Sequence, residues 1–314
     1  MSKNKGLKVY ISKLKYDIKE YNYHKHNFGI KYAISFFLTY IFKTQRYKTR
    51  LRAISILDKE FGWIFEKYSK LTYSKVAENN KNIFFYWSQG KENMPFVPKK
   101  SLEQLYKLYP DYNIYFLCDN NIDEYLHLDD NIWMLYKEGK ITVQTFSDIL
   151  RFNLLSKYGG VWVDSTLLFL EKLPLSEYIN KYGFYSLNNN SEEKNKIWGK
   201  VYPVTYTTFF LCTHKENYNM LACVEFYNEF YKKYNHAIDY FMNDYMLILC
   251  MKYKLCNNQL AQIPIIDGNP FDLYNYIENK NKSLEKIFNC PQKLNWRDFN
   301  IEKLKDILNN IGKI

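Results

Sequence analysis

Residues 142–164 contain the pattern that most restricts the fold of this chain. A helical stretch ends at Gly159 and Gly160, and a short apolar run, VWVD, follows it and ends in Asp164. Glycine is the usual residue just after a helix, because it accepts a positive φ. The pattern predicts a helix over 142–157 that leads into a buried strand over 161–164. Asp164 then places a carboxylate at the end of that strand.

Two further buried strands precede this unit. NIFFYWSQ, residues 82–89, and NIYFLCD, residues 113–119, are apolar runs separated by a helical pattern over about 99–108. Strand, helix and strand at this spacing are typical of a parallel α/β unit of the nucleotide-binding type. Ligands of such sheets bind beyond the carboxyl ends of the strands, so Asp164 lies where a site is expected. The alternative interpretation of Asp164 is a turn residue that acts with Ser165 and Thr166.

The rest of the chain carries weaker patterns. Short helices are expected around 121–138, and NNNSEEKNK indicates a loop. The final part of the chain is polar and gives no clear prediction. The apolar patterns predict helices over about 216–234 and 238–253, and strands over 183–187, 204–212 and 260–266.

The positive charge is concentrated at the N-terminus. Residues 1–80 hold 17 Lys and Arg against 6 Asp and Glu, which accounts for the whole formal net charge of +11. We therefore divide the chain into a basic helical arm, 1–80, and an α/β domain, 81–314. Basic residues beside apolar patches at helical spacing favour an anionic membrane surface as partner of the arm. A solvated basic cap is the alternative, and nucleic acid is not expected, because no nucleic-acid motif is present.

The expected location is the cytoplasm, peripheral on the inner face of the cell membrane. The six cysteines are scattered without a CxxC pair, and no apolar signal segment precedes them, which favours reduced thiols. The longest apolar run of the arm, Tyr32 to Phe42, is far shorter than the ~20 residues of a spanning helix.

Asp148 and Arg151 add a second polar feature to the helix over 142–157. They are three residues apart and share one helix face, opposite the apolar residues. Taken alone, this spacing indicates only a surface ion pair that stabilises the helix by about 0.2–0.5 kcal/mol.

Together these features resemble a known family. SDILR, about seven more helical residues, GG and a strand ending in Asp resemble the sugar transferases that carry a DxD motif (glycosyltransferase family 32-like). FSDILRFNLLSKYGGVWVDST is most similar to their capsular polysaccharide synthesis branch. FFYWSQGKENMP, YPDYNIYFLCD and KEGKIT follow that branch in order and spacing, and IDYFMNDYMLI and KLNWR are similar to its later landmarks. The resemblance covers residues 81 to about 297.

The resemblance implies a GT-A (Rossmann-like) fold that binds a nucleotide sugar. It implies transfer of a sugar from a donor that is usually UDP-linked to a hydroxyl, with retention at the anomeric carbon. Trp87 matches the aromatic residue that stacks on the nucleobase, and a core tryptophan is its alternative interpretation. Asp148 and Arg151 match the pair that holds donor sugar and ribose hydroxyls, which needs a carboxylate and a guanidinium on one face.

Asp164 matches the first aspartate of DxD, but Ser165 and Thr166 follow it, so the second aspartate is missing. The family implies a divalent cation, Mn²⁺ or Mg²⁺, bound by carboxylates, phosphate oxygens and water. Asp164 is the predicted first ligand. Asp244 is the candidate second ligand or catalytic carboxylate, and a helix-surface acid is its alternative interpretation.

Lys293 and Trp296 in KLNWR are predicted to close over the donor diphosphate, with the Lys compensating its charge; a solvated C-terminal segment is the alternative. His214 and His236 have no metal-ligand spacing and receive no role. The predicted function is transfer of a hexose to a lipid-linked oligosaccharide in capsular or surface polysaccharide synthesis. The missing second aspartate keeps another hypothesis open, a catalytically silent scaffold that binds a nucleotide sugar or a partner enzyme.

Overall fold

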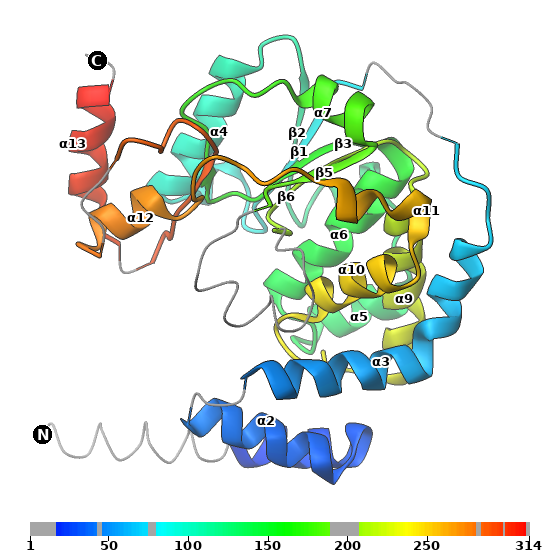
Figure 1. Ribbon diagram of the computed structural model, residues 1–314. Helices are drawn as coiled ribbons and strands as arrows, with labels where there is room; N and C mark the ends of the chain where they lie inside the picture. The colour runs from blue at the N-terminus through cyan, green and yellow to red at the C-terminus, as the bar shows by residue number, and fades with distance from the viewer. Residues whose placement is uncertain are drawn as a thin grey trace, which may run out of the picture.

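A five-stranded sheet forms the centre of the molecule (Figure 1). The computed structural model describes residues 17–42, 46–74, 80–188, 207–280, 284–297 and 299–311. The order is β2-β1-β3-β6-β5, with β1 parallel to β2 and β3, and β6 antiparallel to β3 and β5. The strands are β1 (Asn82–Tyr86), β2 (Asn113–Leu117), β3 (Gly160–Val163), β5 (Phe184–Ser186) and β6 (Phe210–Thr213).

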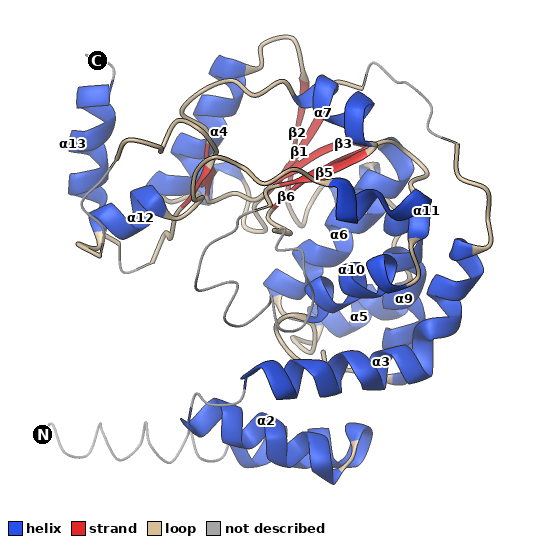
Figure 2. Cartoon of the chain, in the orientation of Figure 1, coloured by secondary structure: helices blue, strands red, loops and turns tan. Residues whose placement is uncertain are grey.

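Helices cover both faces of this sheet, as Figure 2 shows with the strands in red. The chain leaves β1 for β2 through α4 and returns to β3 on the other side of β1 through α6, so right-handed crossovers place these two helices on opposite faces. The α/β class predicted from the sequence is confirmed by this mixed sheet and its covering helices. The helices of the body are α4 (Phe96–Leu108), α5 (Asp130–Lys137), α6 (Val143–Tyr158), α7 (Leu175–Tyr182), α9 (Tyr218–Lys233), α10 (Met242–Lys252) and α11 (Leu255–Asn258).

The C-terminal part forms a smaller layer beside α4, left in Figure 1. Here β4 (Leu167–Leu168) pairs antiparallel with β7 (Gln292–Lys293). A separate apolar cluster fills this layer, with Leu168 next to residues of α12 (Asp272–Ile277) and α13 (Ile301–Ile311). This layer brings the end of the chain to the strand segment that follows Asp164.

The N-terminal arm packs on the body through helical residues 17–28, α2 (Ile30–Phe42) and α3 (Arg46–Ser69). Leu57, Ile64 and Phe65 of α3 are buried in the same core as α9 and α10. In the described part of the chain, no helix combines the length and apolarity needed to cross a membrane.

The predicted helices over 99–108, 142–157, 216–234 and 238–253 are confirmed as α4, α6, α9 and α10. The strand predicted over 260–266 is wrong. Residues Gln259–Gln262 form a 3-10 turn, and only Ile265 makes a β-bridge, to Asn188. Pro264 explains this, because proline cannot donate to a strand ladder. Apart from Asn188, the predicted loop NNNSEEKNK lies outside the described residues, as do residues 204–206.

Candidate active site

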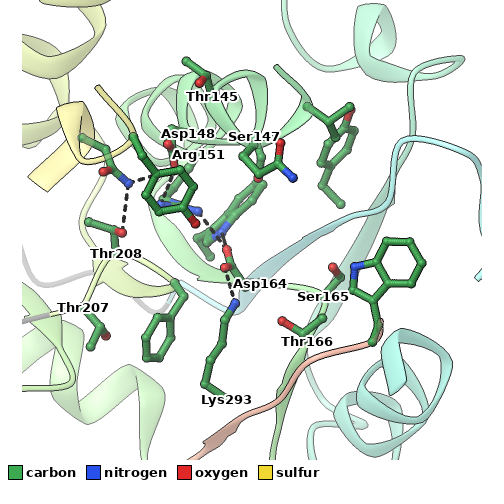
Figure 3. A pocket seen from close by; sticks show the side chains of 18 of the residues that line it. Thr145, Ser147, Asp148, Arg151, Asp164, Ser165, Thr166, Thr207, Thr208 and Lys293 are labelled. Atoms are coloured by element: carbon green, nitrogen blue, oxygen red, sulfur yellow. Dashed lines mark hydrogen bonds and ion pairs between the residues drawn. The ribbon is translucent and has the colours of Figure 1, made fainter. Parts of the chain in front are cut away.

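A pocket of about 840 Å³ lies beyond the carboxyl ends of β1 and β3 (Figure 3). Its walls come from the start of α6, from residues 164–166, from 207–209 with 240–244, and from 293–297. The seven site residues predicted from the sequence all line this one pocket: Trp87, Asp148, Arg151, Asp164, Asp244, Lys293 and Trp296. The structure therefore brings together residues that are as much as two thirds of the chain apart in sequence, Trp87 and Trp296.

Asp164 is the most heavily bonded residue of the pocket. Its Oδ1 accepts hydrogen bonds from Arg151 Nη2 and from Trp162 Nε1, both at 2.8 Å, and its Oδ2 accepts one from Lys293 Nζ at 2.6 Å. Burial alone would raise the pKa of Asp164, but the charges of Lys293 and Arg151 outweigh it and hold the pKa below its usual value. Asp164 is thus an ionised carboxylate between two cations.

Asp148 and Arg151 occupy one face of α6, as their spacing predicted. Arg151 Nη1 lies 2.8 Å from Asp148 Oδ1 as an ion pair, so the buried guanidinium bridges Asp148 and Asp164. Burial raises the pKa of Asp148 to about 7; Arg151 opposes this shift, and the neighbouring charges of Asp164 and Asp244 add to it. The two aspartates therefore differ strongly in acidity, although one guanidinium contacts both.

The long-range contact between Lys293 and Asp164 follows from the pairing of two short strands. β4 begins three residues after Asp164, and its Leu167 lies opposite Lys293 of β7. The N–H of Leu294 also donates to the carbonyl oxygen of Thr166 at 2.9 Å. This register places the ammonium group of Lys293 over the carboxylate.

Asn243 and Thr208 belong to the same network and were missed by sequence reasoning. Asn243 Nδ2 lies 3.0 Å from Asp148 Oδ1 and 3.0 Å from Thr208 Oγ1, donating to both. The one available signal for Asn243 was its place next to Asp244, in the IDYFMND landmark. Thr208 carries no motif, so nothing in the sequence marked it.

Two tryptophans lie together in the pocket wall. The rings of Trp87 and Trp296 meet edge to face, with centroids 5.3 Å apart, and the guanidinium of Arg297 lies 4.3 Å from the Trp296 ring. The buried Trp87 Nε1 has no hydrogen-bond partner among the described residues. Both rings are half-buried, so they offer aromatic surface to a ligand.

Asp164 and Asp244 line the pocket together, as a two-carboxylate metal site requires. Within the described ranges, no group of three or more His, Cys, Asp or Glu side chains is arranged for a metal ion. Mg²⁺ commonly uses only one or two carboxylates together with substrate phosphates. Asp164 and Asp244 match this number of carboxylates, and both oxygens of Asp164 already accept hydrogen bonds from Arg151, Trp162 and Lys293.

A family model described as "Capsular polysaccharide synthesis protein" matches residues 31–309. The match includes the whole pocket. It begins inside the arm, earlier than residue 81, where the resemblance was expected to start. The packing of α2 and α3 on the body agrees with this wider extent.

Two curated relatives match part of the chain. "Glycosyltransferase afumC" of Aspergillus fumigatus (strain CBS 144.89 / FGSC A1163 / CEA10) is 25% identical over 134 residues, 40% of this chain and 33% of that protein. "O-glycosyltransferase braB" of Annulohypoxylon truncatum is 27% identical over 96 residues, 28% and 23% of the two chains. The match thus spans a third or less of either relative. A solved structure titled "PaToxG Glycosyltransferase" aligns with a TM-score of 0.37 and 15% identity, over 80% of this chain and 100% of that one.

The raised pKa of Asp148 predicts a measurable effect on stability. Between pH 4 and about 7 the folded protein retains a proton that the unfolded chain has lost, so the free energy of unfolding falls as pH rises. Asp148→Asn cannot ionise, so its Tm should depend less on pH in this range. At pH 7.5 the variant should be more stable than the wild type by roughly 1–4 kcal/mol.

Thermal melts at several pH values measure this difference. Asp123→Asn, an exposed site in the 3-10 turn Ile122–Glu124, is the matched control and should follow the wild type. Parallel pH slopes for Asp148→Asn and wild type would contradict the assignment.

Proposed function

The chain belongs to the capsular polysaccharide synthesis protein family, and we propose that it is a glycosyltransferase that transfers a hexose from a UDP-sugar to a hydroxyl of a lipid-linked oligosaccharide. The observation that supports this most is the network in which Arg151 bridges Asp148 and Asp164 while Lys293 contacts Asp164. It combines carboxylates that can accept bonds from sugar hydroxyls with cations that can bind phosphate.

In this proposal each wall of the pocket binds one part of the donor. Trp87 and Trp296 provide aromatic surface for the uracil base. Lys293 and Arg151 provide positive charge for the diphosphate, and Asp148 accepts hydrogen bonds from the sugar or ribose hydroxyls. The Asp148 carboxylate is held for this by Asn243 and Arg151.

The reaction breaks the bond between the anomeric carbon and the diphosphate oxygen and forms a bond to the acceptor oxygen, whose proton passes to the leaving diphosphate. Negative charge then collects on the leaving UDP, where fixed cations in a water-poor pocket stabilise it most effectively. Asp244 is the proposed catalytic carboxylate, because it lines the same pocket as Asp164. Retention at the anomeric carbon is part of the proposal.

The proposal also includes a divalent cation, Mn²⁺ or Mg²⁺, held by Asp164 and Asp244 together with donor phosphates. Such an ion supplies Lewis-acid stabilisation of the leaving group when bound. Lys293 now contacts Asp164 Oδ2, so it would move from this oxygen toward the phosphates.

One alternative is a protein that binds the nucleotide sugar but does not transfer the sugar. Ser165 and Thr166 stand where the second aspartate of DxD is expected, which favours a silent scaffold that binds a nucleotide sugar or a partner enzyme. Both proposals predict that the protein binds the donor, but only the glycosyltransferase proposal predicts turnover.

The arm carries the proposed membrane contact. Two acidic side chains of α3 pair with the body, Asp58 with Lys252 and Glu60 with Lys233. Its outer side carries exposed basic residues, and Trp63, half of whose surface is exposed, lies among them. On the outer side of α3 the exposed basic residues are Lys48, Arg52, Lys59 and Lys70. Cations with an exposed tryptophan suit an anionic membrane interface.

Release of UDP from a panel of UDP-hexoses tests turnover. We expect at least one donor to be hydrolysed, and Asp164→Asn to lower the rate about 10²-fold or more, because the variant loses the charge that fixes Lys293 and Arg151. Asp123→Asn is the matched control with an unchanged rate. Binding of UDP without turnover of any donor would favour the scaffold.

The metal proposal has its own measurement in the same assay. EDTA should lower the rate of UDP release at least tenfold, and added Mn²⁺ or Mg²⁺ should restore it. An unchanged rate in EDTA, with the chelator in large excess, would remove the cation from the proposal and leave Lys293 as the counter-charge.

Membrane binding is measured by sedimentation with phosphatidylcholine vesicles that contain or lack phosphatidylserine. Arg52→Glu with Lys59→Glu should weaken binding to the anionic vesicles at least tenfold, since each basic residue contributes about 1 kcal/mol. Lys107→Glu with Lys181→Glu reverses two exposed charges on the body and is the matched control. Equal losses in the two double variants would show that total charge, not the arm, determines binding.

A further inference from the structure

Residues 236–244 form a wall that the catalytic pocket shares with the arm. On one side Tyr240, Phe241, Asn243 and Asp244 line the pocket. On the other side the segment contacts the helical residues 17–28, α2 and α3. The wall consists of part of the connection between α9 and α10 and the first residues of α10.

The first set of contacts joins residues 17–28 to the start of the wall. Tyr23 Oη donates to the carbonyl oxygen of His236 at 2.5 Å, and the two rings meet edge to face at 5.3 Å. Glu20 Oε2 lies 3.4 Å from His236 Nε2. These contacts fix both the main chain and the side chain of His236.

The second set comes from α2 and α3. The buried Tyr32 donates its hydroxyl to the carbonyl oxygen of Ile238 at 3.1 Å. The guanidinium of Arg50, also buried, lies 4.1 Å from the centroid of the Phe241 ring. Contacts from three successive helical segments of the arm thus converge on six residues.

Hydrogen bonds within the wall connect these arm contacts with the part of the wall that faces the carboxylates. Asp239 accepts the N–H of Phe241 at 2.6 Å and the hydroxyl of Tyr245 at 2.5 Å. Two residues after Phe241, Asn243 donates to Asp148. Hydrogen bonds and packed rings thus connect the arm to Phe241, and the main chain of 241–243 connects Phe241 to Asn243, which bonds to Asp148.

We propose that the arm positions this wall for catalysis, and that Tyr23 and Tyr32 are positioning residues that set Asn243 and Tyr240 relative to Asp148. Tyr240 is three-quarters exposed at the pocket, so the wall also sets an aromatic surface that faces the substrates. The consequence for turnover rests on the proposed glycosyl transfer, whereas the mechanical link between arm and wall does not.

The test removes the two hydroxyls and keeps the rings, in Tyr23→Phe with Tyr32→Phe. Hydrogen exchange followed by mass spectrometry should show faster exchange in peptides over 234–248 and unchanged exchange over 160–168. Lys67→Met is the matched control. Lys67 Nζ lies 2.6 Å from Glu225 Oε2 of α9, so Lys67 also links the arm to the body, but it does not contact the wall. Tyr23→Phe alone serves if the double variant does not fold.

Kinetic measurements distinguish a positioning role of Tyr23 and Tyr32 from a role in stability alone. The double variant should release UDP from its donor roughly threefold to tenfold more slowly, from misplacement of the reacting groups. Its Kd for UDP should not change, since the two tryptophans lie on another wall. Lys67→Met should show neither effect.

Three results would overturn the proposal. One is unchanged exchange over 234–248, and another is equal exchange changes in the Lys67→Met control. The third is faster exchange with an unchanged rate of UDP release, which would leave the contacts a stabilising role only. If the wild type releases no UDP, the proposed function fails, and exchange still decides whether the arm holds the wall.

Discussion

The buried carboxylate of Asp164 is the interaction on which the site depends. An isolated charge at this position would cost several kcal/mol of desolvation, so its ionised form requires the donors that surround it. These come from three elements: Trp162 precedes it in β3, Arg151 belongs to α6, and Lys293 belongs to β7. The C-terminal layer is therefore a structural requirement of the pocket, since it supplies one of the two cations.

The same network creates two carboxylates of different character. Arg151 contacts both Asp148 and Asp164, but Lys293 contacts only Asp164. The extra cation lowers the pKa of Asp164, while burial raises that of Asp148 to about 7. A neutral or weakly ionised acid beside a permanent anion lets one pocket offer both a proton and a negative charge.

The sequence predicted what depends on local pattern. The helix, the glycine pair and the strand that ends in Asp164 follow from residues near one another, so Asp148 and Arg151 fell on the correct helix face. Lys293 was placed through resemblance to a family, because a two-residue strand has no periodicity to read. Asn243 and Thr208 were missed because a hydrogen bond across 35 residues leaves no spacing signal. Apolarity alone suggested a strand over 260–266, where Pro264 prevents one.

The missing second aspartate of DxD and the position of Lys293 both affect the balance of charge around Asp164. Thr166 stands where the second aspartate is expected, is largely buried, and its carbonyl oxygen bonds to Leu294, the neighbour of Lys293. A carboxylate at 166 would add a further buried acid to a pocket that already holds Asp148, Asp164 and Asp244 against Arg151, Lys293 and Arg297. With a neutral residue there, the strand pairing of β4 and β7 can bring an ammonium group directly onto Asp164. Thr166 and the strand β7 are therefore neighbours in the fold. The network remains balanced without a second aspartate because β7 supplies the cation of Lys293 to Asp164.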